Sequence, residues 1–288
     1  MRSQKYLRDE LRFVTEFNTL FDVVQQASSS HLRRLEERVG DAPSLMAVVA
    51  EEFFPLLPSS AGAHALVRGG AEGRLLVVIT ADEGLVGPLH TAVVREAQQR
   101  ARGVAEWLLI GQRGLRLIGR QVAPVRVVPM PPEERVVEQM QHVTQFLLTQ
   151  YVRRALKDVW LVAPRFLSAT RQDVAAYQLL PLPAPRTTDL IEGMDVVVEP
   201  SVARLVERLA EAWLDSACIE AFWSARRAEF AARALHIEAS RQELARRSRT
   251  LRHEFFKTLH ERVDVMVRET CVVQRHVAHR AASRGASQ

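Results

Sequence analysis

Two short stretches of this sequence carry residue types suited to catalysis. Asp82 and Glu83 stand where an apolar, β-branched run ends, and neighbouring carboxylates are suited to general acid–base chemistry. No nucleophile or third polar group converges on them in the sequence, so a turn or helix-start role is favoured. His253 and Glu254 begin like the zinc motif H-E-x-x-H, but Lys257 occupies the position of the second histidine. The sequence therefore predicts no catalytic residue and no metal site.

The first of these stretches continues into a glycine-containing loop. Residues 84–87 follow a run expected to be a strand, which is where α/β sheets often bind phosphate-bearing ligands. The loop lacks the pattern G-x-G-x-x-G, and Pro88 has no amide hydrogen to donate there. The sequence also contains no G-x-x-x-x-G-K-[ST], which excludes a P-loop ATPase site. Turn glycines are favoured over a dinucleotide site, and no cofactor is expected.

The composition describes a soluble, basic protein of one or two domains. The chain has 288 residues, 47% of them hydrophobic and 25% charged, with a net charge of +5 and a pI of about 9.7. Acidic protein surfaces, nucleic acid and phospholipid are all compatible with this charge. Cys218 and Cys271 form no C-x-x-C motif, and no secretory signal is evident, which favours a reducing, cytoplasmic setting. No apolar run approaches the roughly 20 residues that cross a bilayer, so we expect no direct membrane insertion.

The elements that must position these residues are organised around a long C-terminal helix. Residues 201–283 contain no proline or glycine and are rich in Arg, Ala, Glu and Leu. Ser201 is a suitable N-cap for this helix. Its second half carries a stripe of apolar residues narrow enough for a coiled-coil seam, namely Leu244, Leu251, Phe255, Leu259, Val263 and Met266. Such a helix requires a partner helix.

The N-terminal segment is the expected partner. Residues 1–39 also lack proline and glycine, and a heptad register runs along them in steps of three or four. Its members are Leu7, Leu11, Val14, Asn18, Phe21, Gln25, Ser28, Leu32, Leu35 and Val39. The polar or small residues in the middle of this seam weaken a coiled coil while fixing its register. We expect the two ends of the chain to form a long antiparallel coiled coil.

The middle of the chain alternates between strands and helices. Short apolar, β-branched runs predict strands at 75–80, 106–110, 125–128 and 159–163, with a fifth extended piece at 174–180. Helices are expected at 89–102 and from about 132 to about 156. The predicted fold class is α/β, with a central Rossmann-like domain whose sheet is mostly parallel. The predicted divisions are the N-terminal coiled-coil helix at 1–56, a linker at 57–73, the α/β domain at 74–196 and the C-terminal coiled-coil helix at 197–288.

This arrangement and several motifs resemble the gamma subunit of the F-type ATP synthase over nearly the whole chain. The family's T-S-D-R-G-L-C-G-x-L-N is similar to residues 80–90, and its I-G-x-x-G to residues 110–114. The run F-x-S-A-x-x-Q is present at 166–172, followed by L-L-P at 179–181. E-P-S stands at 199–201 before the last helix, and E-x-A-A-R-M is similar to residues 229–234. At the amino end, the family's I-R-x-x-I and S-K-L-R-R are similar to residues 7–11 and 30–34.

The resemblance implies a non-catalytic subunit of a rotary ATP synthase. Such a subunit is the central rotor shaft, which couples ion flow through the membrane sector to ATP synthesis or hydrolysis at the beta subunits. The implied partners are the alpha and beta subunits, with one shaft per three of each, the epsilon subunit and the c-ring, without nucleic acid. The implied location is peripheral, at the cytoplasmic face of the bacterial inner membrane.

The resemblance also leads to a set of expected contact residues. Basic side chains on the terminal helices are expected to face the alpha and beta subunits: Arg8, Arg12, Arg33, Arg34, Arg252 and Lys257. For any single one of them a solvated helix face is the simpler interpretation, so the hypothesis concerns the group. The central lobe is expected to contact epsilon and the c-ring through Asp82, Gly84, Leu85, Gly87, Phe166, Ser168 and Gln172.

Departures from the family pattern point to a divergent or alternative form. The family's first helix has K-I-T-K-A-M where this chain has T-L-F-D-V-V at 19–24. Its last helix carries polar residues that form a catch against a loop of the beta subunit. Leu259, His260, Asp264 and Met266 stand in their places here. The resemblance therefore leaves that contact in question.

Two other functions are compatible with the residues. A coiled-coil adaptor or nucleic-acid-binding protein would dock its Arg-rich last helix on phosphates, with an affinity that falls steeply as salt rises. A small-molecule α/β enzyme would bind its ligand saturably in the lobe. Neither explains the two complementary terminal helices together with the motifs at 166–182, which favours the rotor shaft.

Overall fold

The structure is a computed structural model that describes residues 4–40, 44–119, 123–184 and 199–285. The chain divides into two compact units, which we call the helix-pair unit and the sheet unit. The helix-pair unit contains Met1–Gln25 and Ile237–Gln288, and the sheet unit contains Gln26–His236. The boundaries between these units fall inside the two long terminal helices. The domain boundaries predicted from the sequence instead keep each terminal helix in a single domain.

The sheet unit is built on five strands in the order β3-β2-β1-β4-β5. Their bounds are β1 Glu72–Ile79, β2 Val104–Ile110, β3 Val125–Val128, β4 Leu156–Ser168 and β5 Arg171–Leu180. All neighbours are parallel except β4 and β5, which form an antiparallel hairpin. The α/β fold with a mostly parallel sheet is confirmed, and each predicted strand overlaps an observed one.

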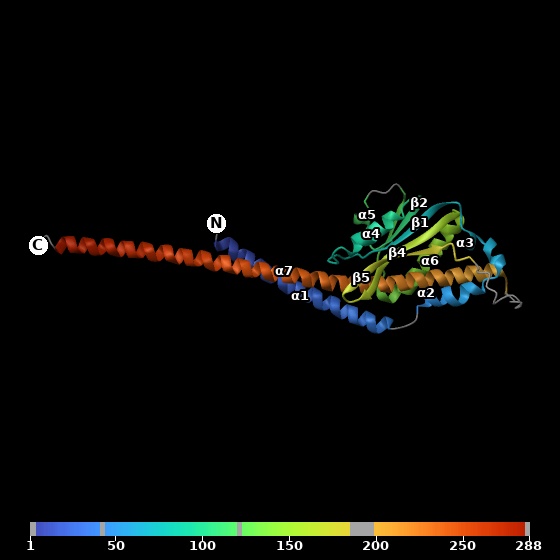
Figure 1. Ribbon diagram of the computed structural model, residues 1–288, viewed down its shortest axis with the longest axis horizontal. Coiled ribbons are helices and arrows are strands. Elements are labelled where there is room, and N and C mark those ends of the chain that lie inside the picture. The colour runs from blue at the N-terminus through green and yellow to red at the C-terminus, as the bar shows by residue number, and fades with distance from the viewer. Residues whose placement is uncertain (1–3, 41–43, 120–122, 185–198, 286–288) are drawn as a thin grey trace. The chain divides into compact units, whose positions relative to one another are not determined.

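Helices cover both faces of the sheet, and the side chains of β1 point alternately into the two cores that lie between the sheet and these helices. Leu75, Val77 and Ile79 pack with α6 (Val136–Arg153) and the first part of α7 (Val202–Gly285). Leu76 and Val78 pack with α4 (Leu89–Gln99) and α5 (Arg113–Ile118). Figure 1 shows α4 beside the sheet on one side and α6 and α7 on the other. A strand buried on both faces must be continuously apolar, which explains the run in the sequence.

Several short helical segments were not predicted. They are α2 (Leu45–Val48), a π-helical turn (Val49–Phe53), α3 (Ala65–Arg68), α5 and the 3₁₀ turns Phe54–Leu56, Ser59–Ala63 and Glu133–Arg135. Helix α1 spans Gln4–Val39, so the range 1–56 contains separate turns after the long helix. Segments of three to six residues are too short to show a helical period in the sequence, which is why they escaped prediction.

In the helix-pair unit, α1 and α7 pack in an antiparallel arrangement. Leu7, Val14 and Leu251 are buried and pack with three half-buried apolar residues, namely Leu11, Leu244 and Phe255. All ten residues of the predicted heptad register on α1 are buried or half-buried. The seam prediction for α1 is therefore confirmed. No helix in the described part of the chain is long and apolar enough to span a membrane.

The polar middle of the seam forms a hydrogen-bonded network. Arg241 donates to the side-chain oxygen of Gln25 at 2.5 Å and pairs with Asp22 at 2.6 Å. Gln25 donates in turn to Glu238 at 3.0 Å. Because these groups satisfy one another only when the helices are correctly aligned, the network fixes the register of the pair.

The predicted seam on α7 is wrong for its last two members. Val263 and Met266 are 49% and 67% exposed, whereas Leu251 is buried. The described part of the partner helix is shorter than α7. Arg262 of α7 donates to Gln4 at 2.9 Å, and Gln4 is the first residue of α1. Helix α7 continues beyond this point to Gly285, with no described residue of α1 opposite it.

The two cysteines should react at very different rates. Cys218 is buried in the sheet unit, and burial raises the pKa of its thiol to about 12. Cys271 is exposed. Iodoacetamide should therefore modify Cys271 in the folded chain and Cys218 only after unfolding, as peptide mass spectrometry would show. A Cys271→Ser variant is the control, and rapid modification of this variant in the native state would contradict the burial of Cys218.

Candidate partner-binding surfaces

The loop after β1 is held in place by Asp82. One carboxylate oxygen of Asp82 accepts the amide of Gln112 at 2.8 Å, and the other accepts the amide of Met130 at 3.1 Å. Gln112 is the N-cap residue just before α5, in the loop after β2, and Met130 follows β3. Asp82 thus has a structural role, in which it joins loops from different parts of the sequence. Its carboxylate joins the loops at the carboxyl ends of three strands.

The glycines of the I-G-x-x-G motif allow a close approach of two loops. A side chain at Gly111 would stand 2.8 Å from the backbone of Thr80, and one at Gly114 would stand 3.0 Å from the Thr80 hydroxyl oxygen. That hydroxyl accepts the amide of Gly114 at 3.0 Å. The motif is thus a structural requirement of the sheet edge, since larger residues would separate the loops.

A buried ion pair anchors the same loop to α7. Arg233 and Glu229 have side chains only 5% and 3% exposed, and their charged groups are 2.6 Å apart. Arg233 also donates to the carbonyl of Gly84 at 3.1 Å. These two residues are the charged positions of the E-x-A-A-R-M-like run. The structure shows that this run ties helix α7 to the loop after β1.

Gly84 and Leu85 occupy special positions in this loop. A Cβ atom at Gly84 would lie 1.6 Å from the guanidinium of Arg113, so a side chain there would displace Arg113. Leu85 has a positive φ of 65°, which is uncommon for leucine, and its side chain is 47% exposed. Gly87 also has a positive φ, of 58°, which favours glycine. The loop presents Leu85 to solvent while its flanks are fixed.

The F-x-S-A-x-x-Q motif forms the turn between β4 and β5. The Ser168 hydroxyl oxygen accepts the amides of Thr170 and Arg171 at 3.3 and 3.1 Å. The Gln172 side chain donates to the carbonyls of Ser168 and Ala169 at 3.1 and 3.3 Å. Ser168 and Gln172 therefore close the hairpin, and their side chains satisfy backbone groups that a turn would otherwise leave exposed.

Phe166 packs the hairpin onto α7. Its amide donates to the Ser224 hydroxyl at 3.0 Å, and the guanidinium of Arg227 lies 5.1 Å from its ring centre. The ring also packs against the cluster of Val86, Leu89, Ala228 and Ala232. Burial lowers the pKa of Arg227. Phe166 is half-buried, so it supports the hairpin more than it is presented to a partner.

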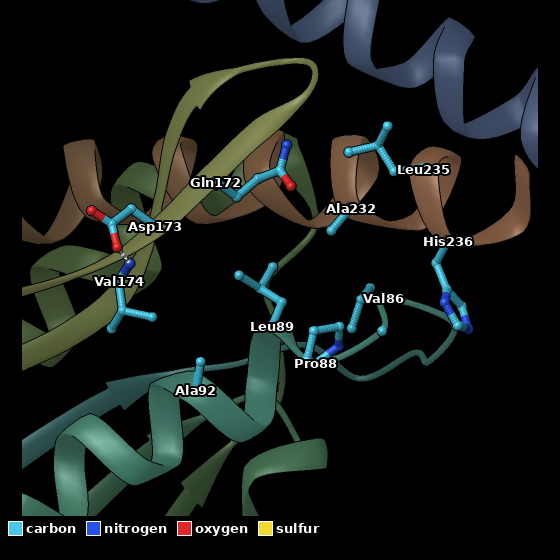
Figure 2. Close-up of a pocket in the computed structure, with 11 residues that line it drawn as sticks. Val86, Pro88, Leu89, Ala92, Gln172, Asp173, Val174, Ala232, Leu235 and His236 are labelled. Atoms are coloured by element: carbon cyan, nitrogen blue, oxygen red, sulfur yellow. Dashed lines mark hydrogen bonds between the residues drawn. The ribbon is translucent and has the colours of Figure 1, made fainter. Parts of the chain in front are cut away.

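The loop and the hairpin meet at a groove, which we call the lobe groove. Figure 2 shows it between the start of α4, the start of β5 and α7. Its volume is about 390 Å³. The lining residues are Val86, Gly87, Pro88, Leu89, Ala92, Gln172, Asp173, Val174, Ala232, Leu235 and His236. Of the lobe residues expected from the sequence, the structure brings Gly87 and Gln172 together here, whereas Asp82 turns toward other loops.

The six basic residues expected to face a ring are divided between the two units. Arg8, Arg12, Arg252 and Lys257 are exposed in the helix-pair unit, while Arg33 and Arg34 are exposed in the sheet unit. Arg12 pairs with Glu16 on its own helix, as the simpler interpretation anticipated. Arg34 donates toward His31, whose pKa is lowered by burial and by Arg34.

The sequence reasoning missed a second apolar stripe on α1. Tyr6, Phe13, Phe17, Leu20 and Val23 are exposed beside the seam, and the rings of Phe13 and Phe17 are 4.8 Å apart. Further exposed apolar side chains lie on the second half of α7: Phe256, Val263, Val265, Met266, Val267 and Val272. The repeat of aromatic residues beside the heptad positions was the available signal. Exposed apolar surface of this extent is typical of a protein-binding face.

No cluster of three or more potential metal-ligating side chains occurs among the described residues. The contacts above also show no nucleophile hydrogen-bonded to a base. The exposed apolar side chains of α1 and α7 are suited to contacts with other proteins.

Comparison with known proteins identifies the family. The family model described as ATP synthase matches residues 3–259. The ATP synthase gamma chain of Ralstonia nicotianae is 24% identical over 259 residues, covering 83% of this chain and 87% of that protein. The gamma chain of Verminephrobacter eiseniae is 26% identical over 258 residues, with 83% and 86% covered.

The fold is also found in solved structures. A chain of the Euglena gracilis mitochondrial ATP synthase, from the OSCP/F1/c-ring part in rotational state 3, matches with a TM-score of 0.70. The two are 16% identical, and the match covers 97% of this chain and 95% of that one. A chain of the rotor of the same enzyme in rotational state 1 gives a TM-score of 0.66 at 15% identity, with 90% and 98% covered. With a family model that matches nearly its whole length, this chain belongs to the ATP synthase family.

Proposed function

We infer that this chain is the central rotor shaft, the gamma subunit, of a rotary ATP synthase. The observation that carries this inference is the pairing of the two chain ends into antiparallel helices whose outer faces are basic and apolar. The relatives named as gamma chains support it over most of the chain length. A shaft transmits movement between other subunits and needs no active site of its own.

The proposed partners of the helix-pair unit are alpha and beta subunits, with one shaft per three of each. Arg8, Arg12, Arg252 and Lys257 would contact acidic loops of these subunits, and the exposed apolar stripe of α1 would lie against their inner surface. Arg33 and Arg34 would contact the same subunits nearer the lobe. Because the shaft presents different faces to different beta subunits, its rotation would bias each toward a different nucleotide affinity.

The proposed partners of the sheet unit are the epsilon subunit and the c-ring. The exposed Leu85 and the lobe groove with Gly87 and Gln172 offer the contact surface. Asp82, Gly84, Phe166 and Ser168 would act indirectly, because their contacts hold the loop and the hairpin that form this surface. The subunit would be peripheral, at the cytoplasmic face of the bacterial inner membrane.

Assembly with its own ring tests this function. The chain is co-expressed with the alpha and beta subunits of the same genome, and the purified complex is measured by native mass spectrometry. We expect one copy with three alpha and three beta subunits, and a higher ATPase activity than the mixture without the chain. A folded chain that stays outside the ring would contradict the shaft and favour the adaptor alternative.

The basic residues of the helix-pair unit should determine the salt dependence of assembly. Replacing Arg8, Arg12, Arg252 and Lys257 together by glutamine should weaken binding to the ring about tenfold or more at low salt. The difference should shrink at high salt, because exposed charges are screened. Binding is measured by surface plasmon resonance at several salt concentrations.

The matched control removes the same charge from the sheet unit. Arg95, Arg102, Arg153 and Arg204 are exposed there. Their replacement by glutamine should leave the affinity for alpha and beta subunits nearly unchanged. If both sets weaken binding equally, the effect comes from net charge alone and the proposed contact residues are wrong.

A further inference from the structure

A second cavity, which we call the cationic pocket, lies beside the loop after β1. Its volume is about 460 Å³. Loop residues 84–87 form one wall, His90 and Thr91 at the start of α4 another, and Arg113 and Arg116 of α5 a third. The pocket therefore stands at the carboxyl ends of β1 and β2, the edge at which open α/β sheets bind their ligands.

The charge of this pocket is positive. Neither Arg113 nor Arg116 forms an ion pair with a carboxylate of the described residues, and no acidic side chain lines the pocket. The two nearby carboxylates are otherwise engaged. Asp82 accepts the amides of Gln112 and Met130, and Glu83 reaches Arg233 at 3.4 Å. Two guanidinium groups are thus available to an anion.

The start of α4 adds unused backbone donors. No side chain caps this helix, and the residue at its N-cap is Pro88. The amides of Leu89 and Ala92 are bonded to the carbonyls of Val86 and Pro88. Those of His90 and Thr91 have no partner within the described residues. Free amides at a helix N-terminus favour an anion, through their hydrogen bonds and the helix dipole.

His90 supplies the observation that points most directly to a ligand. Its side chain is only 4% exposed, it lines the pocket, and neither ring nitrogen has a hydrogen-bond partner among the described residues. Burial, aided by Arg113 and Arg233, lowers the pKa of His90 to about 4, so the ring is neutral at pH 7 and still has an N–H to donate. A buried polar group without a partner is costly. A bound anion would provide the missing acceptor.

We propose that the cationic pocket binds a phosphate group, either free phosphate or the phosphate end of a nucleoside phosphate. Arg113 and Arg116 would neutralise its charge, and the backbone amides of His90 and Thr91 and the ring N–H of His90 would donate hydrogen bonds to its oxygens. The sequence pattern argued against a dinucleotide loop because Pro88 lacks an amide. The two free amides follow that proline. The pocket shares Leu85 and Gly87 with the surface proposed above for the epsilon subunit and the c-ring.

Calorimetric titration of the full-length chain tests the proposal. The probes are inorganic phosphate, ADP and ATP, each added without magnesium at low salt, with ³¹P NMR as a second readout. We expect saturable binding of one ligand per chain. Similar affinities for all three probes identify free phosphate as the natural ligand, whereas binding of ADP or ATP at least about tenfold tighter identifies a nucleoside phosphate. The absence of saturable binding at millimolar concentrations of every probe would overturn the proposal.

Three variants locate the binding site. Arg113→Gln and Arg116→Gln should each weaken binding about tenfold or more, because each removes charge-assisted hydrogen bonds. Arg116 is exposed, so its replacement does not threaten folding. Arg95→Gln is the matched control, since Arg95 is exposed on α4 outside the pocket. Equal weakening by Arg95→Gln would show non-specific attraction and contradict the site.

His90→Leu separates a binding role from a structural one. If His90 serves a ligand, the variant should bind phosphate several-fold more weakly while its melting temperature without ligand stays the same or rises. A fall in melting temperature with unchanged phosphate binding would show that His90 is only a core residue, and would overturn its place in the site.

Discussion

Replacing Arg233 by methionine should lower the free energy of unfolding by about 3 kcal/mol, since breaking a buried ion pair typically costs about 3–5 kcal/mol. The substitution leaves Glu229, whose side chain is 3% exposed, without its nearest cation, and leaves the Gly84 carbonyl without its donor. The loss lies at the lower end of the range because Arg226 still pairs with Glu229 at 2.8 Å. Urea unfolding followed by circular dichroism measures the change.

Two controls test the cause of this loss. The double variant Glu229→Gln/Arg233→Met should recover much of the stability, because no uncompensated charge then remains buried. Arg204→Met breaks the exposed pair with Glu207 and should cost less than about 1 kcal/mol. If Arg233→Met costs no more than Arg204→Met, the pair does not anchor the loop after β1.

The second large effect is a loss of stability in mild acid. The pKa of His90 is about 4 in the folded chain, against 6.5 as its ordinary value. Between these values the unfolded chain binds a proton that the folded chain does not, so stability falls as the pH drops from 6.5 to 4. The loss from this residue should reach about 3 kcal/mol, at about 1.4 kcal/mol per unit of pKa. Burial raises the pKa of Asp215 above its ordinary value of 3.8. As the pH falls toward 3.8, the folded chain therefore binds a proton at Asp215 more readily than the unfolded chain does. The resulting gain in stability offsets part of the loss from His90.

Urea unfolding at several pH values, in a buffer without phosphate, measures this loss. His90→Leu should remove most of the decline between pH 6.5 and 4. His142→Leu is the matched control, because His142 is an exposed histidine of α6 and its replacement should leave the decline intact. A wild-type stability that stays constant over this range, or an undiminished decline in His90→Leu, would contradict the burial of a neutral His90.

Much of the fold could be predicted because it depends on local periodicity. The heptad register of α1 and the apolar strands are visible within short windows of sequence, and the structure confirms both. Helix α5 was missed because its six residues between Gln112 and Gly119 show no helical period. The seam was extended too far, to Met266, because the pattern on α7 does not reveal where its partner helix begins.

The binding surfaces were less predictable because their contacts join residues far apart in the sequence. The loop residue Gly84 is held by Arg233, 149 positions away, and Asp82 by amides 30 and 48 positions away. Nothing in the local pattern indicates these partners. The resemblance located the motifs at 80–90 and 166–172, but only the structure shows that Asp82, Ser168 and Gln172 stabilise loops. The exposed stripe with Phe13 and Phe17 was not predicted, because its residues lie next to the heptad positions in the sequence and were not distinguished from them.

Rotation of this chain inside its ring tests the central claim most directly. A probe is attached to a Gln99→Cys variant that also carries Cys218→Ala and Cys271→Ser, since Gln99 is exposed at the end of α4. The ring of alpha and beta subunits is fixed to a surface, ATP is added, and the probe is followed by single-molecule microscopy. The account predicts continuous rotation in one direction that stops when ATP is removed. A probe that stays still while the ring hydrolyses ATP would contradict it.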